Sequence, residues 1–208
     1  MNAFVLAGGQ STRMGRDKAM LALGGRPLIE HALDKLRALG FSPRIAGSRS
    51  DLAAFAAVVP DRHPQAGPLG GIEAALAASD TEQNFFLPVD LPWLPLEFLR
   101  WMIDRANGTE ALATIPRFQG RPQPLCAAYG KALLPYAQAA LVADDAKVMR
   151  AVEQAANATG LRIDSFDVET VAAAQSWKQP LPLHRWFENI NTPPDLKKAA
   201  LEQTARIH

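Results

Sequence analysis

The sequence has very little cysteine, no long apolar run and no large excess of charge of either sign. Cys126 is the only cysteine among 208 residues, so no intramolecular disulfide can form, as is usual in a reducing compartment. No stretch reaches the roughly 18 to 20 apolar residues of a membrane-spanning helix. The opening "MNAFVLAGGQ" lacks the basic region and the length of a signal peptide. We therefore expect a cytoplasmic protein with no membrane partner.

The charge balance excludes a strong global electrostatic field. Lysine and arginine total 22 and aspartate and glutamate 21, which gives a formal net charge of +1. Such a chain is not drawn as a whole to nucleic acid or to acidic lipid, so we expect no nucleic-acid partner. Hydrophobic residues make up 48% of the chain, enough for the core of one large domain. We therefore expect a single domain over residues 1–208, with any anion-binding site confined to a local segment.

Short apolar runs alternate with helical periodicity in the first half of the chain. Apolar runs predict strands over residues 3–7, 43–47, 56–60 and 84–89. Spacings of three and four between apolar residues predict helices over 28–39, from about 71 to 78, and after Pro95. This alternation is typical of crossover units. The predicted fold is α/β, a Rossmann-like three-layer α/β/α arrangement with a mostly parallel central sheet.

The second half is less regular. The patterns predict a turn or extended loop over 117–124, strands over 125–129 and 161–168, helices over 132–143 and 147–158, and a last helix beginning near Pro193 or Pro194. Trp177 and Trp186 favour core or lid positions over a stacking platform for a ligand. No repeat and no obvious linker separates this half from the first.

The segment "LAGGQSTRMGRDKA", residues 6–19, carries the clearest functional signal. Three cations, Arg13, Arg16 and Lys18, lie within six positions and follow a pair of glycines. The two standard glycine-rich phosphate-loop patterns do not match. The segment nevertheless leaves a predicted strand at its carboxyl end, where open α/β sheets bind ligands, and glycine N–H groups with Arg13 and Lys18 suit a triphosphate. The alternative is a solvated turn whose cations have no common ligand.

Two acidic residues also follow predicted strands. Asp90 comes directly after the run 84–89, and a carboxylate beside phosphates requires a bridging cation such as Mg²⁺. Alternatively, Asp90 forms an Asx-type turn before Pro92. Asp61 opens "DRHPQAGPLGGI", whose glycines would admit a base or ribose, or would simply form a turn before the next helix.

Side chains suited to covalent or histidine chemistry are scarce. The four histidines show no spacing typical of metal ligands. Cys126 lies in an apolar run without a neighbouring histidine, which favours a buried structural thiol over a nucleophile. We therefore expect no covalent enzyme intermediate.

Four segments together carry a family resemblance: "LAGGQSTRMGRDKA", "GPLGGI", "VDLPWL" and "NINTPPDL". They resemble the nucleotidyltransferase superfamily and, within it, the MobA-like molybdenum cofactor guanylyltransferases. The resemblance implies transfer of GMP from GTP to molybdopterin, with release of pyrophosphate and with Mg²⁺ as cofactor. It also implies a nucleotide-binding half, 1–107, and a pterin- or acceptor-binding half, 108–208.

The resemblance also implies roles for individual residues. Those expected to bind the nucleotide are Leu6, Ala7, Gly8, Gly9, Lys18, Asp61, Gly67, Pro68, Leu69 and Asp90. Lys18, Arg13 and Asp90 are expected to be catalytic, with Asp90 as the Mg²⁺ ligand. Acceptor binding is expected from Asn189, Asn191 and Arg121.

The sequence departs from the family pattern at two places. An asparagine-rich run of the N-A-N-R type reads "AGSR" here, which leaves Ser48 as the candidate replacement for an asparagine contact. A histidine–proline pair of the family is changed to "GRPQP". Both departures concern substrate contacts rather than the type of reaction.

Several activities share these features. A cytidylyltransferase for the same cofactor, or a sugar-phosphate or alditol-phosphate nucleotidyltransferase, would need the same loop and the same metal ligand. A non-catalytic chaperone that hands over the cofactor is the alternative outside enzymes. In the guanylyltransferase reaction the acceptor phosphate is already ionised and requires no general base, and a molybdoenzyme or its chaperone would receive the product.

Overall fold

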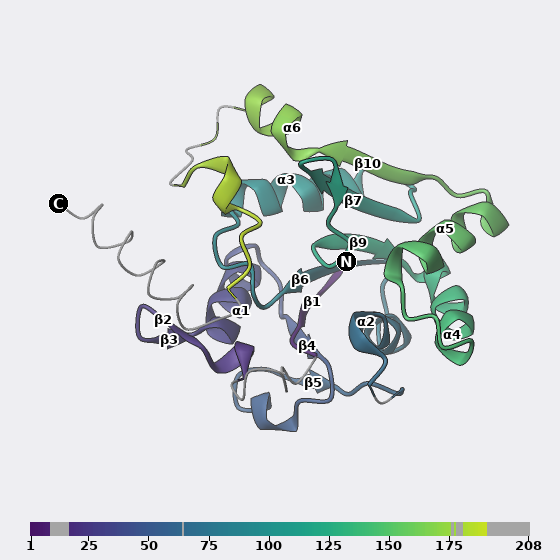
Figure 1. Cartoon of the computed structure of the whole chain (residues 1–208), viewed down its shortest axis with the longest axis horizontal. Helices are drawn as coiled ribbons and strands as arrows, with labels where there is room; N and C mark the ends of the chain where they lie inside the picture. Colours follow the sequence, from purple (N-terminus) through teal and green to yellow (C-terminus); the bar gives the residue numbers. More distant parts are fainter. Residues whose placement is uncertain (9–16, 64, 176, 178–180, 191–208) are drawn as a thin grey trace.

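The computed structural model describes residues 1–8, 17–63, 65–175, 177 and 181–190, and its centre is a mostly parallel sheet (Figure 1). In spatial order the strands are β10 (Ile163–Asp167), β7 (Ala113–Phe118), β9 (Ala127–Gly130), β6 (Gln83–Pro88), β1 (Asn2–Leu6), β4 (Arg44–Ala46) and β5 (Val58–Val59). The short strand β8 (Arg121–Pro122) pairs with β7. Among these strands β8 and β9 run against the common direction of the others.

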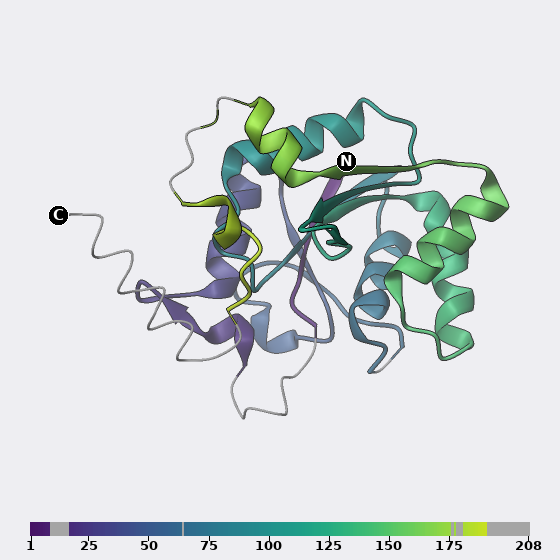
Figure 2. The ribbon, with the colours of Figure 1, turned by 45° about the horizontal axis from the view of Figure 1, so that its top comes forward.

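Helices cover both faces of the sheet (Figures 1 and 2). One face packs against α1 (Leu28–Ala38), α3 (Leu96–Asn107) and α6 (Val168–Ala174), and the other against α2 (Gly67–Ala77), α4 (Leu134–Val142) and α5 (Val148–Thr159). Strand β1 contributes side chains to the hydrophobic cores on both faces of the sheet. Val5 packs into the first core, whereas its neighbours Phe4 and Leu6 pack into the second, because successive side chains point to opposite faces. The predicted three-layer fold is confirmed.

The second half of the chain completes the same sheet. Strands β7, β9 and β10 all follow residue 107, and β9 pairs directly with β6 of the first half. The predicted loop over 117–124 is only partly right: the turn at Gln119 and Gly120 exists, but β7 and β8 form a hairpin around it. Neither β7 nor α6 was predicted, because a short strand that contains Thr114, Pro116 and Arg117 and a seven-residue helix carry weak patterns. The helix predicted from Pro193 or Pro194 lies outside the described residues.

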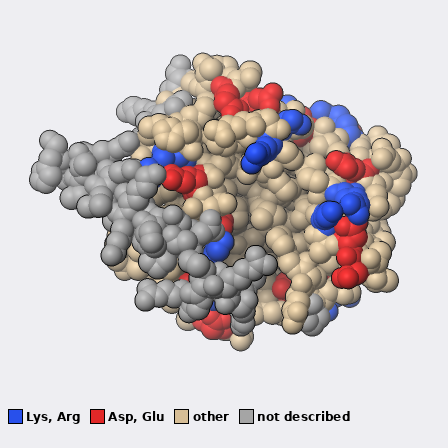
Figure 3. Space-filling view, viewed as in Figure 1, with Lys and Arg blue, Asp and Glu red and all other residues tan. Residues whose placement is uncertain are grey.

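Charged side chains of both signs lie on the surface of the described part. Figure 3 shows cationic and acidic side chains interspersed on the face in view, without one patch of a single sign covering it. Within the described ranges, no helix has the length and apolar character needed to cross a bilayer.

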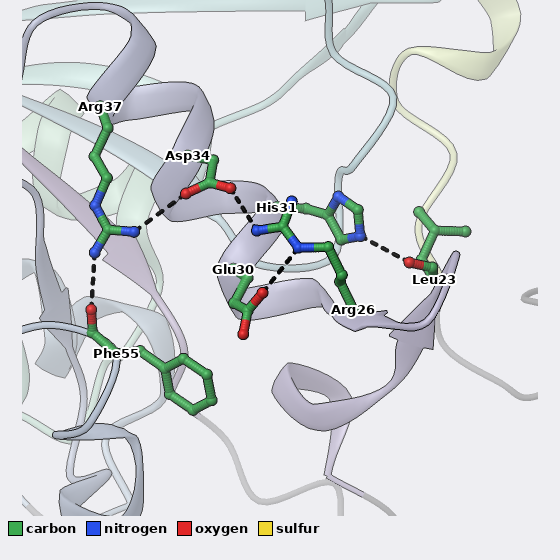
Figure 4. Close-up of polar contacts among 7 residues, drawn as sticks. All are labelled: Leu23, Arg26, Glu30, His31, Asp34, Arg37 and Phe55. Carbon is green, nitrogen blue, oxygen red and sulfur yellow. Dashed lines mark hydrogen bonds and ion pairs between the residues drawn. The ribbon is translucent and has the colours of Figure 1, made fainter.

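Polar contacts anchor the segment between β1 and α1 to the outer side of α1 (Figure 4). The short elements of this segment are η1 (Lys18–Met20), β2 (Ala22–Leu23) and β3 (Arg26–Pro27). Arg26 donates to Glu30 at 2.9 Å and to Asp34 at 2.6 Å, and a ring nitrogen of His31 lies 2.9 Å from the Leu23 carbonyl oxygen. Exposed pairs of this kind contribute little individually. Together they connect the η1 segment to a regular helix.

The carboxyl ends of β1 and β4 approach each other so closely that only glycine fits. Gly47 has φ +137°, and a Cβ added there would lie 3.0 Å from both the amide nitrogen and the Cα of Gly8. Such a distance leaves no room for a side chain without a shift of backbone. The absence of a side chain at Gly47 therefore permits the close approach of these strand ends.

We predict that Gly47→Ala lowers the free energy of unfolding by on the order of 3 kcal/mol, because backbone strain and a close contact add up. Gly160→Ala is the matched control, since Gly160 also has a positive φ, +72°, but a Cβ there would meet nothing within 4 Å. The control is expected to lose about 1 kcal/mol from backbone strain alone. Urea unfolding measures both, and equal losses would show that the Gly8 contact is unimportant.

Lys35 of α1 is a partly buried cation that binds the segment after β6. Its ammonium donates to the Leu94 carbonyl oxygen at 2.7 Å. Burial lowers the pKa of Lys35 from 10.5 to about 8, and the nearby Glu97 carboxylate opposes this shift. The folded protein therefore binds this proton less tightly than the unfolded chain does.

The lowered pKa of Lys35 predicts that stability increases with pH. Between about pH 8 and 10.5 the unfolded chain keeps the proton that the folded state has lost, so the free energy of unfolding rises with pH. From about pH 7.5 to 9.5 the gain is on the order of 2 kcal/mol relative to Lys35→Met, which lacks this titration. Denaturant midpoints at both pH values measure the gain, with exposed Lys147→Met as the control. Parallel pH profiles of Lys35→Met and the unmodified chain would contradict the assignment.

Candidate active site

A cleft of about 350 Å³ lies where the carboxyl ends of β1, β4 and β6 meet. It is lined by residues from these strand ends, from η1, from the start of α2 and from the segment before β9: Leu6, Ala7, Gly8, Asp17, Lys18, Ala19, Ala46, Gly67, Pro68, Gly71, Pro88, Val89, Asp90 and Leu125. This is the position at which open α/β sheets bind ligands, and the volume is within the range of small-molecule sites.

Lys18 and Asp90 face each other across this cleft. The Lys18 ammonium lies 3.3 Å from Oδ2 of Asp90, although 72 residues separate them in the sequence. Their side chains are 31% and 19% exposed, so both remain accessible to a ligand. The Asp90 carbonyl oxygen accepts a hydrogen bond from the Ile190 N–H at 3.0 Å. Residues from both ends of the described chain therefore meet at Asp90.

The wall formed by α2 presents backbone rather than side chains. The helix begins at Gly67, has proline in its first turn, and has no side-chain hydrogen bond to cap it. The first N–H groups of a helix carry a partial positive charge and lack partners within the helix, which favours an anion in front of them. Leu69, predicted to bind the nucleotide, is fully buried in the core and does not line the cleft.

Asp61 lies behind the glycines rather than in the cleft lining. A Cβ added to Gly8, Gly70 or Gly71 would come within 4.0 Å of the Asp61 carboxyl group. Its Oδ1 is buried and has no hydrogen-bond partner in the described structure. Burial raises the pKa of Asp61, a hydrogen bond from the Ser48 backbone lowers it, and the charge of Glu73 raises it further. The Asp61 carboxyl group therefore lies against the glycine backbone with one oxygen lacking a hydrogen bond in the described structure.

The structure separates some of the other predicted residues from the cleft. Arg121 on β8 and Asn189 are exposed and do not line it. Ser48 accepts a hydrogen bond from the Asp61 N–H at 3.2 Å through its hydroxyl. Gly9, Arg13 and Asn191 lie outside the described residues.

The remaining reactive or aromatic candidates belong to the core. Cys126 is fully buried, and burial raises the pKa of its thiol to about 12, so it is not a thiolate near neutral pH. Trp186 is fully buried and packs with Phe98 and the half-buried Trp177, as expected for core positions.

Sequence reasoning missed two buried charged groups next to the cleft. Arg49, 6% exposed, binds Asp17, which lines the cleft, and Asp51. In the sequence, the only indication of Arg49 was a single cation just beyond the predicted strand 43–47, in the run "AGSR". Glu73, fully buried on α2, accepts hydrogen bonds from Arg62 at 3.1 Å and from a glutamine of α4 at 2.9 Å. In the sequence, the only indication of Glu73 was a single acidic residue in an otherwise apolar predicted helix.

Asp90 is chemically suited to hold Mg²⁺. Its carboxylate provides hard oxygen atoms at the cleft, and Mg²⁺ in phosphate sites commonly takes one or two carboxylates together with phosphate oxygens and water. The other lining carboxylate, Asp17, is already bound by Arg49. Within the described ranges, no three His, Cys, Asp or Glu residues cluster as a metal cage. A metal here would therefore depend on the oxygens of a bound ligand.

Comparison with known proteins gives concordant results. A family model described as the MobA-like NTP transferase domain matches residues 3–159. The chain is 31% identical over 196 residues to a probable molybdenum cofactor guanylyltransferase of Carboxydothermus hydrogenoformans, covering 93% of this chain and 92% of that protein. It is 35% identical over 149 residues to the molybdenum cofactor guanylyltransferase of Vibrio cholerae, covering 70% and 73%.

The fold comparison agrees. The crystal structure of the molybdopterin-guanine dinucleotide biosynthesis protein A of Archaeoglobus fulgidus superposes with a TM-score of 0.78 at 26% identity, covering 99% of this chain and 100% of that one. Because the family model covers most of the chain, and full-length relatives and fold agree with it, this chain belongs to the MobA-like NTP transferase family and is a nucleotidyltransferase.

Proposed function

We propose that this protein transfers GMP from GTP to molybdopterin and releases pyrophosphate, which forms the guanine dinucleotide form of the molybdenum cofactor. The observation that carries the proposal is the Lys18–Asp90 pair in a glycine-lined cleft at the carboxyl edge of the sheet. A cation for the phosphates and a carboxylate for their counter-ion stand there side by side. The names of relatives from Carboxydothermus and Vibrio support the choice of guanylyl transfer.

In the proposed reaction, a terminal phosphate oxygen of molybdopterin attacks the α-phosphorus of GTP. The new oxygen–phosphorus bond replaces the bond to the bridging oxygen of the β-phosphate, and pyrophosphate leaves with its electron pair. The attacking oxygen is already ionised, so no side chain has to remove a proton. This agrees with a cleft whose described lining contains no histidine or cysteine.

The chain's own contribution is placement and charge. The backbone around Gly8 and the first turn of α2 offer N–H groups and space where a side chain would block a phosphate or a base. Lys18 stabilises negative charge that develops on the phosphates. Mg²⁺, which Asp90 would hold, supplies additional charge neutralisation when bound. Rate acceleration would arise from orientation and electrostatic stabilisation rather than from a covalent intermediate.

The proposal also includes the acceptor site, the compartment of the reaction and the recipient of its product. The acceptor would lie against the half after residue 107, where Arg121 and the asparagines Asn189 and Asn191 remain its proposed contacts. We place the reaction in the cytoplasm, in keeping with one buried free thiol and no possible intramolecular disulfide. A molybdoenzyme or its chaperone would take up the product.

The deciding experiment incubates the purified protein with molybdopterin, Mg²⁺ and one nucleotide at a time, GTP, CTP, ATP or UTP. We expect pyrophosphate release and a GMP–molybdopterin adduct with GTP, identified by mass spectrometry. Turnover with CTP alone would identify a cytidylyltransferase. Turnover only after replacement of molybdopterin by a sugar phosphate or alditol phosphate would identify another acceptor. Binding of nucleotide without pyrophosphate release would support a non-catalytic role.

We predict that Lys18→Ala lowers turnover by roughly 10²- to 10³-fold, equivalent to about 3 to 4 kcal/mol, because one cation aimed at developing charge is lost. Thermal stability should change little, because a partly exposed ion pair contributes at most about 1 kcal/mol. Lys18→Arg should restore activity only in part, since a planar guanidinium does not replace a compact ammonium. Exposed Lys147→Ala is the control and should leave steady-state rates unchanged. Wild-type rates in Lys18→Ala would mean that the glycine-rich segment is only a turn.

We predict that Asp90→Asn keeps the fold and raises the Mg²⁺ concentration needed for half-maximal activity by about tenfold or more, because a neutral amide is a poor ligand for a hard cation. Titrating Mg²⁺ at fixed GTP measures the shift. Asp104→Asn, on the exposed side of α3, is the matched control and should show the wild-type curve. An unchanged Mg²⁺ requirement in Asp90→Asn would remove this carboxylate from the metal site.

A further inference from the structure

We propose that Arg49 is the positioning residue of the active site, which acts by fixing the place of Lys18 relative to the end of β1. This role rests on the proposed nucleotidyl transfer. Arg49 follows β4 and immediately precedes η2 (Ser50–Leu52), so it reaches the cleft from a strand that contributes little else to it.

The contacts of Arg49 use the whole guanidinium group. Its side chain is only 7% exposed and makes five hydrogen bonds. Nε and Nη2 bind the two oxygens of Asp51 at 2.9 and 2.7 Å. Nη1 binds Oδ1 of Asp17 at 3.0 Å and Nη2 binds its other oxygen. Nη1 also donates to the Ala7 carbonyl oxygen at 3.3 Å. A guanidinium has five N–H donors, so this arrangement satisfies it completely.

Two of these partners belong to the cleft itself. Ala7 is the residue after β1, and Asp17 immediately precedes Lys18; both line the cleft. The Asp17 carboxylate also caps η1 by accepting the Ala19 N–H at 3.0 Å. One side chain that follows β4 therefore joins the beginning and the end of the glycine-rich segment. The position of the Lys18 backbone follows from this link.

The link also explains how a carboxylate can line an anion-binding cleft. Asp17 would repel the phosphates of a nucleotide, but its charge is paired with the Arg49 guanidinium through two parallel hydrogen bonds. Hydrogen bonds to Asp51 and Asp17 raise the pKa of Arg49 further, against the effect of its burial, so the cation is permanent. Lysine could keep this charge but not the geometry, since a single ammonium cannot bridge two carboxylates and a carbonyl group.

Arg49→Lys tests the proposal, because it keeps the charge and removes the bridge. We expect kcat to fall by roughly ten- to a hundredfold, since displacement of a catalytic group by about 1 Å is enough for a loss of this size. KM for the nucleotide should change less than about threefold, because the charge near the phosphates is retained. Rates are expressed per folded protein, with the folded fraction taken from thermal unfolding.

Arg105→Lys is the matched control. Arg105 makes a comparable bidentate pair with the buried Asp164, at 2.6 and 2.7 Å, between α3 and the outermost strand β10. This control should lose stability but keep both kinetic constants. A similar fall of kcat in Arg105→Lys would show that loss of any buried pair has this effect, and would overturn the specific role of Arg49.

Combination with Lys18→Ala distinguishes positioning from a general structural role. If Arg49 acts through Lys18, Arg49→Lys should lower kcat less than about threefold when Lys18 is already absent. The full ten- to hundredfold loss in the Lys18→Ala background would overturn the proposal. Should Arg49→Lys not fold, Asp17→Asn breaks the same link while keeping an oxygen for the Ala19 N–H, and the same pattern is expected.

A measurement without substrate separates this inference from the proposed function. The reactivity of the Lys18 amine toward an acylating label, read by mass spectrometry on the ligand-free protein, should change several-fold in Arg49→Lys and stay at the wild-type value in Arg105→Lys. An unchanged Lys18 reactivity in Arg49→Lys would overturn the positioning role whatever the enzyme transfers. Altered reactivity in a protein that is inactive with all four nucleotides would support the role and contradict guanylyl transfer.

Discussion

The parallel register of β1 with β6 is the constraint on which the site depends. Leu6 pairs with Pro88, and one residue further the Val89 N–H binds the Leu6 carbonyl oxygen at 3.1 Å. Pro88 has no N–H to continue the ladder, so the chain leaves the sheet here and delivers Asp90 beside the segment that follows β1. The 3.3 Å approach of Lys18 to Asp90 is a consequence of this shared strand end.

Much of this arrangement was predictable, because strand ends are marked by local signals. An apolar run followed by glycines located the end of β1, and an apolar run followed by proline and Asp90 located that of β6. Parallel crossover units then require both ends at one edge. By contrast, β7 was not predictable, because its residues neither alternate between apolar and polar nor form a continuous apolar run. Its membership in the sheet is decided by pairing with β9 and β10, which is a long-range effect.

The contributions of Asp61 and Arg49 were harder to predict, for a different reason. An aspartate after a strand is visible in sequence, but the glycines that crowd it follow β1 or lie in α2, and their distances exist only in the fold. Arg49 likewise looks like a surface cation in the sequence, but its side chain is buried and binds Asp17, Asp51 and the Ala7 carbonyl group. Residue type indicates which chemistry is available, whereas burial determines which partner must be used.

The active-site region therefore combines two opposite uses of buried charge. At Arg49 every donor is satisfied, and a completely satisfied network holds its members in one geometry. At Asp61 a buried oxygen lacks a partner, which destabilises the charged form and raises the pKa of the carboxyl group. A ligand whose hydrogen-bond donor reaches this oxygen would supply the missing hydrogen bond without first removing water from the oxygen. The binding of such a ligand is favoured over that of a ligand without the donor. The satisfied charge at Arg49 thus fixes geometry at the edge of the cleft, whereas the unpaired oxygen of Asp61 lies behind the glycines near it.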